Sequence, residues 1–184
     1  LLEAVRRVSS IALVHEALAR AGDEAVPLDD VVRVVVASMS ELGGVAGDIR
    51  TEGVFGEVPS EVATPLVVVI GELLHNAAEH AYPEGQPGPV IVRAGRRRGL
   101  LRVVVSDRGV GLPRDGAARS TRGLGLSIVR TLVEDEIGGL FSIGPGVGTD
   151  GTAWGTEAVV EVPLRDQSVS GDQGLAAGAQ DPQR

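Results

Sequence analysis

Three short motifs, in a fixed order along the chain, constrain its fold more than any other feature. They are Glu72–His80, Asp107–Gly111 and Gly123–Leu126. The first lies in a long apolar run with helical spacing, the second closes a strand-like apolar run, and the third is a glycine turn that opens another helical run. One glycine loop alone would carry little information, because glycine punctuates turns in most proteins. In this order the three motifs predict a helix, a strand end and a helix start that meet around a nucleotide.

The composition narrows the class of protein further. With 184 residues the chain is long enough for one domain, and its 43% apolar but only 2% aromatic content requires an aliphatic core. The formal charge is −8 and all 17 basic residues are arginine, so a nucleic-acid partner is not expected. The lack of cysteine excludes disulfides and thiolate metal sites, and it fits a cytoplasmic location. No apolar run approaches the roughly 20 residues that span a bilayer, so no membrane segment is expected.

The spacing of apolar residues predicts an α+β fold. Helices are expected at 1–20, 27–42, 60–82 and 123–136, and strands at 90–94, 100–106, 140–144 and 158–163, with a further strand within 47–58. The glycine-rich stretch 144–151 is interpreted as a turn, and the arginines at 96–98 as the solvated tip of a hairpin. Residues from 165 lack periodicity and are expected to form a disordered tail. Together the elements predict a two-layer sandwich, in which helices cover one face of a mixed, mostly antiparallel sheet.

The first motif carries three polar side chains on one helix face. Glu72, Asn76 and His80 recur every four residues. A carboxylate, an amide oxygen and an imidazole in this register can hold hydrated Mg²⁺ and meet phosphates, since Mg²⁺ prefers hard oxygen ligands. The alternative is a solvated polar face. Asn76 argues against that alternative, because asparagine is a poor residue inside a helix.

The two glycine motifs suit the two ends of a nucleotide. Asp107, at a strand end, can accept a hydrogen bond from an exocyclic amine such as that of adenine, while Gly109 and Gly111 let a flat ring approach the backbone. Gly123 and Gly125 open a helix whose free amides suit a phosphate. Each motif alone could equally be a turn without a ligand. A P-loop is excluded because the chain has no lysine, and the dinucleotide-binding fingerprint lacks its third glycine.

As an ordered set, these motifs resemble those of the GHKL ATPases, which include gyrase-type topoisomerases, heat-shock chaperones, histidine kinases and MutL-type repair proteins. The residues that carry the resemblance are Glu72-x-x-x-Asn76 for the asparagine box, Asp107-x-Gly109-x-Gly111 for the first glycine box and Gly123-x-Gly125-Leu126 for the second. Gly155-Thr156 looks like the final Gly-Thr element of the family, and Gly151-Thr152 competes for that role.

Within this superfamily the resemblance is to sensor histidine kinases with a short ATP lid and a variant dimerisation domain. Ala63–Ala77 is similar to the asparagine box of that subfamily, and Arg7–Leu18 looks like the second helix of its dimerisation hairpin. In such kinases the acceptor histidine lies on the preceding helix, so His15 is not interpreted as the acceptor. We therefore expect a fragment that is unable to autophosphorylate. Its expected parts are 1–22, the end of a truncated dimerisation domain, 27–164, the ATP-binding domain with the histidine-kinase ATPase fold, and 165–184, the tail.

The resemblance also implies roles for the motif residues. Asp107 would read the adenine amine, supported by Thr156. Asn76 would hold Mg²⁺ on the phosphates of ATP, and Glu72, as the catalytic residue, would order water or the metal. The other ATP-binding residues would be His80, Gly109, Gly111, Arg122, Gly123, Gly125 and Leu126. The γ-phosphate would pass to a histidine on the upstream helix and then to the receiver domain of a response regulator, in a kinase that forms a homodimer through its helical segment.

One departure from the family pattern bears on affinity. Many members carry lysine three residues after the box asparagine, where this chain has Glu79. Either Arg119, Arg122 or His80 supplies the missing positive charge, or nucleotide affinity is weak. Two alternatives to a histidine kinase stay open. One is an anti-sigma-factor-type serine kinase, which resembles the same core, and the other is a degenerate module that binds nucleotide or partner proteins without phosphate transfer.

Overall fold

The computed structural model describes residues 25–41, 48–83, 86, 88–112, 124–147 and 153–164. In chain order its elements are β1 (Val26–Pro27), α2 (Leu28–Glu41), β2 (Ile49–Gly53), β3 (Glu57–Val58), α3 (Ser60–His80), β4 (Val90–Arg97), β5 (Leu100–Asp107), α4 (Leu124–Arg130), the π-helix η2 (Thr131–Glu136), β6 (Leu140–Val147) and β7 (Ala153–Pro163). The segments expected to be a dimerisation helix (1–22) and a tail (165–184) lie outside the described residues.

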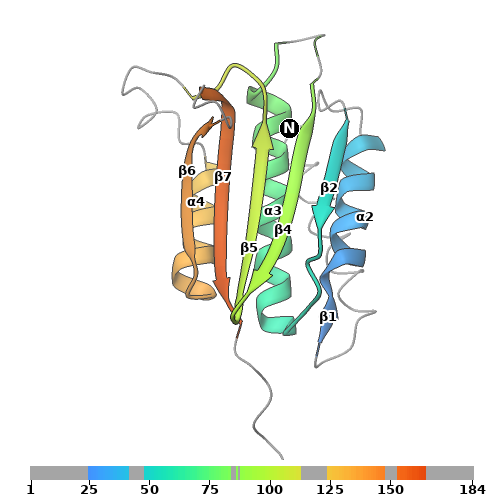
Figure 1. Cartoon of the computed structure of the whole chain (residues 1–184), viewed down its shortest axis with the longest axis vertical. Helices are drawn as coiled ribbons and strands as arrows, with labels where there is room; N and C mark the ends of the chain where they lie inside the picture. Colours follow the sequence, from blue (N-terminus) through green and yellow to red (C-terminus); the bar gives the residue numbers. More distant parts are fainter. Residues whose placement is uncertain are drawn as a thin grey trace, which may run out of the picture.

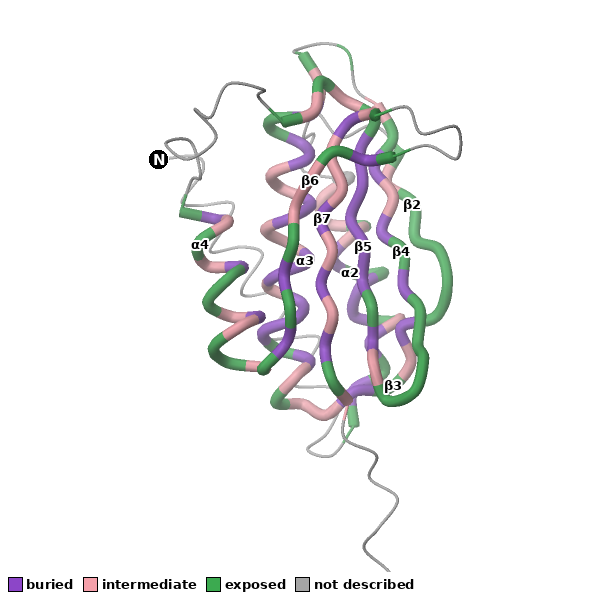
Figure 2. The backbone as a smooth tube through the Cα atoms, turned by 60° about the vertical axis from the view of Figure 1, so that its left-hand side comes forward, coloured by how far each residue is buried: buried purple, intermediate pink, exposed green. Residues whose placement is uncertain are grey.

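The strands form one sheet of five strands and one of two. The larger sheet has the order β2-β4-β5-β7-β6; β2 runs parallel to β4, and the other neighbours are antiparallel. The smaller sheet pairs β1 with β3. Figures 1 and 2 show α2, α3 and α4 on the same side of the large sheet. The predicted α+β fold, with a mixed, mostly antiparallel sheet covered on one face by helices, is confirmed.

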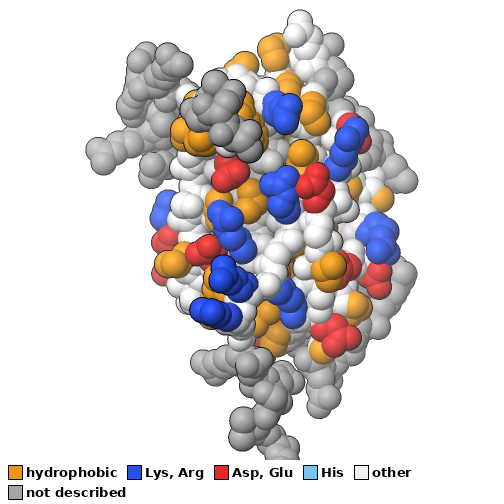
Figure 3. Space-filling model, in the orientation of Figure 1, with side chains coloured by type: hydrophobic (Ala, Val, Ile, Leu, Met, Phe, Trp, Pro, Cys, Tyr) orange, Lys and Arg blue, Asp and Glu red, His pale blue; other side chains and the backbone are white. Residues whose placement is uncertain are grey.

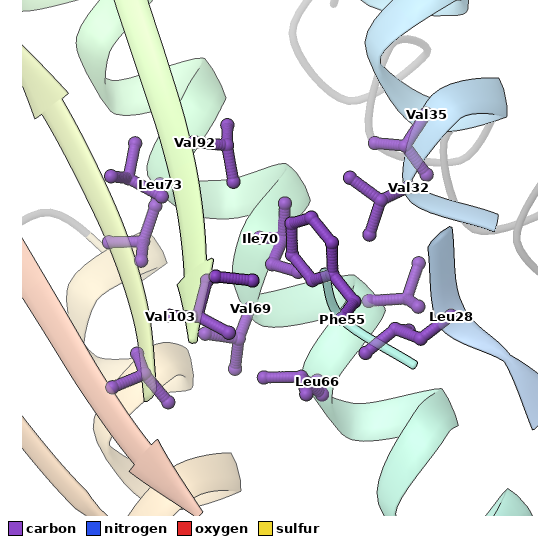
Figure 4. Close-up of a cluster of buried hydrophobic side chains, with 14 of the residues drawn as sticks. Leu28, Val32, Val35, Phe55, Leu66, Val69, Ile70, Leu73, Val92 and Val103 are labelled. Atoms are coloured by element: carbon purple, nitrogen blue, oxygen red, sulfur yellow. The ribbon is translucent and has the colours of Figure 1, made fainter. Parts of the chain in front are cut away.

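The core lies between the large sheet and α3. Side chains alternate along a strand, so Val90, Val92 and Ala94 of β4 are buried while the residues between them are more exposed. Helix α3 presents Ile70 and Leu73, among other apolar residues, to this side of the sheet (Figure 4). Figure 2 shows that the buried segments of α3 and of the central strands lie against each other.

The opposite face of the sheet carries mixed charges. Figure 3 shows arginine and acidic side chains interleaved across it. Two pairs link neighbouring strands: Arg93 with Glu52 at 2.8 Å, and Arg102 with Glu161 at 3.4 Å. Arg93 and Arg102 are therefore each balanced by an acid on the neighbouring strand.

Helix α3 is long and apolar enough, by length and composition alone, to cross a membrane, which the sequence analysis did not anticipate. However, 56% of its most apolar window is buried inside the protein. Residues such as Leu66, Ile70 and Leu74 are fully buried in the core cluster. The apolar character of this helix is thus accounted for by its place at the centre of the fold.

The last two strands are longer than the sequence predicts. In place of the turn expected at 144–151, β6 continues to Val147 and β7 already begins at Ala153, where the two strands pair. Pro145 is tolerated because β6 is an edge strand, in which one side of the backbone needs no partner. The register shifts after Pro145 and leaves Gly155, with φ +42°, as an extra residue of β7. This bulge brings the start of β7 close to the end of β5.

The start of α2 also differs from the prediction. Pro27, expected in the first helical turn, pairs with Glu57 in the small sheet, and the helix begins at Leu28. The next residue, Asp29, accepts hydrogen bonds from the backbone amides of Phe55 (3.0 Å) and Gly56 (2.6 Å). Its carboxylate therefore attaches α2 to the loop between β2 and β3.

Arg96 corrects the expectation of a purely solvated hairpin tip. Its guanidinium donates hydrogen bonds to the carbonyl oxygens of Phe55 (2.6 Å) and Glu57. The loop between β2 and β3 is thus held by Asp29 through its amides and by Arg96 through its carbonyls. This loop lies at the end of the sheet opposite Asp107, because Arg97 pairs with Leu100 at the start of β5.

Candidate nucleotide-binding site

Three predicted parts of the site come together at one end of the sheet. The C-terminal end of α3, the end of β5 and the start of β7 lie at the upper end of the molecule in Figure 1, and α4 begins lower down, beside α3. The backbone amide of Val110 donates to the carbonyl oxygen of Ala81 (2.8 Å), which joins the turn after β5 to the end of α3. The amide of Thr156 donates to the carboxylate of Asp107 (3.2 Å), which joins β7 to β5.

Asp107 is the best-defined polar group of the site. Its side chain is buried, and its Oδ1 atom accepts hydrogen bonds from the amides of both Gly109 (2.9 Å) and Thr156 (3.2 Å). No residue in the described ranges donates to Oδ2. A carboxylate fixed in this way presents its second oxygen as an acceptor in a defined direction.

The first glycine motif fits closely against α3. A side chain at Gly109 would place its Cβ 1.8 Å from the carbonyl oxygen of Ala81, so only glycine allows this approach. Gly111 follows in the same turn with φ +73°. A Cβ at Gly155 would lie 2.0 Å from the carbonyl oxygen of Asp107, so the bulge of β7 depends on glycine as well. From the sequence, Gly109 and Gly111 are explained by the turn and by the approach of a ring, and the tight contact at Gly155 is not predicted.

The polar residues of the first motif lie on α3, the helix whose C-terminal end leads into Ala81, which contacts this turn. Glu72 and Asn76 are half-buried, whereas the side chain of His80 is 73% exposed. The Nδ2 atom of Asn76 is buried and has no hydrogen-bond partner among the described residues. A buried amide donor without an acceptor costs about 1–3 kcal/mol, so an acceptor that reached this atom would remove that cost.

Glu79 stands where many GHKL ATPases have a lysine, and its carboxylate lies close to two histidines, His75 and His80. Its Oε1 atom lies 3.1 Å from Nε2 of His75, and its Oε2 atom lies 4.0 Å from Nε2 of His80. The contact with His75 has ion-pair distance without hydrogen-bond geometry. Where many family members have the ammonium group of a lysine, this chain therefore has the carboxylate of Glu79 close to the imidazoles of His75 and His80.

The second glycine motif is only partly within the described residues. Gly125 is buried at the start of α4, and Leu126 packs against the core. Arg122, Gly123, Arg119 and Thr152 lie outside the described ranges, so their predicted roles stay predictions, as does the choice between Thr152 and Thr156.

One residue of the site was missed from the sequence. Tyr82, just after α3, donates its hydroxyl hydrogen to the carbonyl oxygen of Pro89 (2.6 Å) and accepts a hydrogen bond from the amide of Arg108 (2.9 Å). Burial raises the pKa of Tyr82 above its ordinary value; the Arg108 hydrogen bond opposes this, and the charge of Asp107 adds to it. The available signal was that Tyr82 is the only tyrosine of the chain and directly follows the first motif.

The chain is similar in sequence to proteins of known family. Residues 50–137 match the model of the histidine kinase-like ATPase domain. The sensor histidine kinase PdtaS of Mycobacterium tuberculosis H37Rv is 44% identical over 167 residues, which are 89% of this chain and 32% of the relative. The PdtaS of Mycolicibacterium smegmatis is 42% identical, over 91% of this chain and 33% of the relative. The chain thus spans about a third of the length of these curated relatives.

A solved structure agrees with the sequence relatives. The histidine kinase domain of the blue-light-activated histidine kinase EL346 from Erythrobacter litoralis superposes with a TM-score of 0.70 at 30% identity, over 87% of this chain and 78% of that domain. The fold of this chain is therefore shared with a histidine kinase domain that is 30% identical to it over most of its length. This chain belongs to the family of histidine kinase-like ATPase domains.

Proposed function

We propose that this chain is the ATP-binding catalytic domain of a sensor histidine kinase, in which the γ-phosphate of ATP passes to a histidine. Its family and the named relatives support this assignment. The observation that supports it most is the arrangement of Asp107, a buried carboxylate with one oxygen fixed by two backbone amides and the other left for a ligand.

The base of the nucleotide would be recognised at Oδ2 of Asp107. The exocyclic amine of adenine is a donor and complements a carboxylate oxygen, whereas the 6-oxo group of guanine is an acceptor and would be repelled. Gly109 and Gly111 let the turn after Asp107 pack against the backbone of Ala81 and Gly155, which helps to hold the carboxylate in place. The site would therefore prefer adenine nucleotides.

The phosphates would lie along the polar face of α3. The buried Nδ2 of Asn76 lacks an acceptor among the described residues, and phosphate oxygens are acceptors. The carbonyl oxygen of Asn76 and the carboxylate of Glu72 are hard donors of the kind that Mg²⁺ prefers, so these residues fit a magnesium ion that is also bound by phosphates. When bound, Mg²⁺ would neutralise part of the charge of the phosphates.

The positive charge that the family's lysine provides must come from elsewhere in this proposal. Arg119 and Arg122 precede the second glycine motif in the sequence. The side chain of His80 is exposed beside the polar face of α3 and lies 4.0 Å from Glu79. We assign the contact with the terminal phosphate to the arginines, because arginine keeps its charge at any physiological pH.

The same proposal includes the partners of the kinase. The phosphate would go to a histidine on a dimerisation helix and then to the receiver domain of a response regulator, in the cytoplasm. The protein would contribute mainly positioning and electrostatic stabilisation, because phosphoryl transfer needs little covalent chemistry from the enzyme.

Calorimetric titration of ATP and ADP, with Mg²⁺ and with EDTA, tests the binding part. We expect the chain to bind both nucleotides, and Asn76→Ala to weaken binding and remove its dependence on Mg²⁺. Thr64→Ala is the matched control on the same helix, since the exposed Thr64 hydroxyl donates to the carbonyl oxygen of Ser60 (3.3 Å), at the end of the helix away from Asn76. No binding to the unchanged chain up to millimolar nucleotide would contradict the proposal and favour the degenerate module.

Phosphate transfer is tested by autophosphorylation of a longer chain that includes an upstream helical segment. Acid-labile phosphate on that chain would identify phosphohistidine and support the proposal. Acid-stable phosphate on an added protein substrate would indicate a serine kinase instead.

A further inference from the structure

The hydroxyl of Tyr82 bridges the two central strands of the site. It donates to the carbonyl oxygen of Pro89, just before β4, and accepts from the amide of Arg108, just after β5. Val90 and Asp107 are the last pair between these strands, so the hydroxyl connects them one residue beyond their ladder. A side chain from the end of α3 thus occupies the point at which β4 and β5 separate.

The ring of Tyr82 packs directly against Gly88, where any residue with a side chain would clash with it. A Cβ at Gly88 would lie 2.1 Å from Cε1 of the ring and 2.3 Å from Cζ. The ring therefore rests directly on the backbone before β4, and this contact sets the position of the hydroxyl.

The neighbouring contact of α3 completes the attachment. The carbonyl oxygen of Ala81 accepts from the amide of Val110, two residues after the amide that the Tyr82 hydroxyl binds. Arg108 and Val110 flank Gly109, whose amide binds Oδ1 of Asp107. The end of α3 thus holds the turn on both sides of the amide that orients the carboxylate.

We infer that Tyr82 is a positioning residue for adenine recognition, because its hydroxyl fixes the turn that aims Oδ2 of Asp107 at the base. This inference rests on the proposed function. It adds a residue that touches neither the base nor the phosphates and acts through Asp107. Removing the hydroxyl should therefore reduce the preference for adenine, while the phosphate end keeps its contacts.

The burial of Tyr82 agrees with this role. The ordinary pKa of a tyrosine, 10.0, already keeps the hydroxyl protonated in the neutral range, and partial burial raises the pKa of Tyr82 further, so the hydroxyl remains a donor to Pro89. Only the protonated form can donate to Pro89 while it accepts from Arg108.

The test compares Tyr82→Phe with the unchanged chain. Phenylalanine keeps the ring on Gly88 and loses both hydrogen bonds. We expect the dissociation constants of ATP and ADP to rise by the same factor, about three- to tenfold, while the dissociation constant of inosine triphosphate, which lacks the amine, changes much less. The matched control is Arg96→Gln, which removes hydrogen bonds to Phe55 and Glu57 at the opposite end of the sheet and should leave all three constants unchanged.

The outcomes separate this inference from the proposed function. If the unchanged chain binds no ATP, the proposed function fails and the inference fails with it. If the unchanged chain binds ATP and Tyr82→Phe binds it equally well, the inference alone is wrong. If Tyr82→Phe weakens ATP and inosine triphosphate by the same factor, the hydroxyl has only a structural role and the inference is also wrong.

A measurement without any variant covers the case in which Tyr82→Phe does not fold. The chain has one tyrosine, so its phenolate absorbance reports Tyr82 alone. Adenosine is the suitable ligand, because it has no phosphate charge that would move the titration. We expect bound adenosine to raise the pKa of Tyr82, since binding that needs the protonated hydroxyl opposes its ionisation. An unchanged pKa at saturating adenosine would overturn the inference.

Discussion

Two aspartates at opposite ends of the sheet make the same kind of contact with different results. Asp29 uses Oδ1 for the amide of Phe55 and Oδ2 for the amide of Gly56, so both oxygens hold the loop between β2 and β3. Asp107 also accepts from two backbone amides, but both bonds end on Oδ1. Both oxygens of Asp29 thus bind backbone amides, whereas Oδ2 of Asp107 remains available to accept a hydrogen bond from a ligand.

The comparison shows what distinguishes a binding carboxylate from a structural one. Asp107 ends an apolar strand and Asp29 lies in the first turn of α2, as the sequence predicts. Asp107 is buried and Asp29 is partly buried. The difference lies in the direction of the backbone amides, which at Asp107 come from its own turn and from the bulge of β7. We therefore expect substitutions at the two aspartates to affect different properties.

The largest effect is expected for Asp107→Asn. Oδ1 must continue to accept from the amides of Gly109 and Thr156, so the new amide group takes the place of Oδ2 and meets the adenine amine donor to donor. Loss of a hydrogen bond to a charged group is worth about 1.5–3 kcal/mol, so ATP affinity should fall by roughly 10- to 100-fold. Calorimetry with ATP measures this. Unchanged affinity would show that Asp107 resembles Asp29 in being structural.

The next effect is expected for Gly155→Ala. A Cβ there would lie 2.0 Å from the carbonyl oxygen of Asp107, and the residue has φ +42°. The strand start must shift, at a cost of about 1–3 kcal/mol in the free energy of unfolding, and ATP affinity should fall as well because Thr156 moves with it. Urea denaturation and calorimetry on one variant measure both. A loss of stability without any loss of affinity would show that the bulge does not position Asp107.

Asp29→Asn is expected to act on stability alone. It replaces one of the two acceptor oxygens that bind Phe55 and Gly56, so the free energy of unfolding should fall by about 1–2 kcal/mol. The dissociation constant of ATP should stay the same, because the loop lies at the other end of the sheet. A weaker affinity for ATP in this variant would mean that the two ends are coupled and that the comparison is too simple.

Much of the fold and of the site could be predicted from the sequence, because the local signals agree with the final structure. The apolar periodicity of α3 and the alternation in β4 and β5 reflect burial directly. Asp107 and Gly109 could be assigned to one turn because they are adjacent in the chain. These predictions rest on spacing within a single element.

The rest depends on contacts between distant segments. Glycine and proline between 144 and 151 are typical of a turn, but pairing of β6 with β7 overrides that preference. The roles of Arg96 and Tyr82 arise from backbone groups that lie 41 and 26 residues away along the chain. No pattern within one element indicates such contacts.

The smallest effect concerns a third aspartate, which is exposed. A hydrogen bond from Arg50 holds the pKa of Asp48 below its ordinary value of 3.8. A carboxyl with a lowered pKa stabilises the folded state above its unfolded pKa, and this contribution is lost as the pH falls through the lower folded pKa. Arg50→Gln should therefore raise the pKa of Asp48, as measured by NMR titration, and leave stability at neutral pH almost unchanged. An unaltered pKa would show that the pair does not form in solution.

The most direct test of adenine recognition compares ATP with inosine triphosphate on the unchanged chain and on Asp107→Asn. If Oδ2 of Asp107 accepts from the amine, the unchanged chain binds ATP more tightly by roughly tenfold or more. Asp107→Asn should lose or invert this preference, because its amide group can donate to the 6-oxo group of inosine. Equal binding of the two nucleotides by the unchanged chain would contradict the assignment of Asp107 as the residue that reads the base.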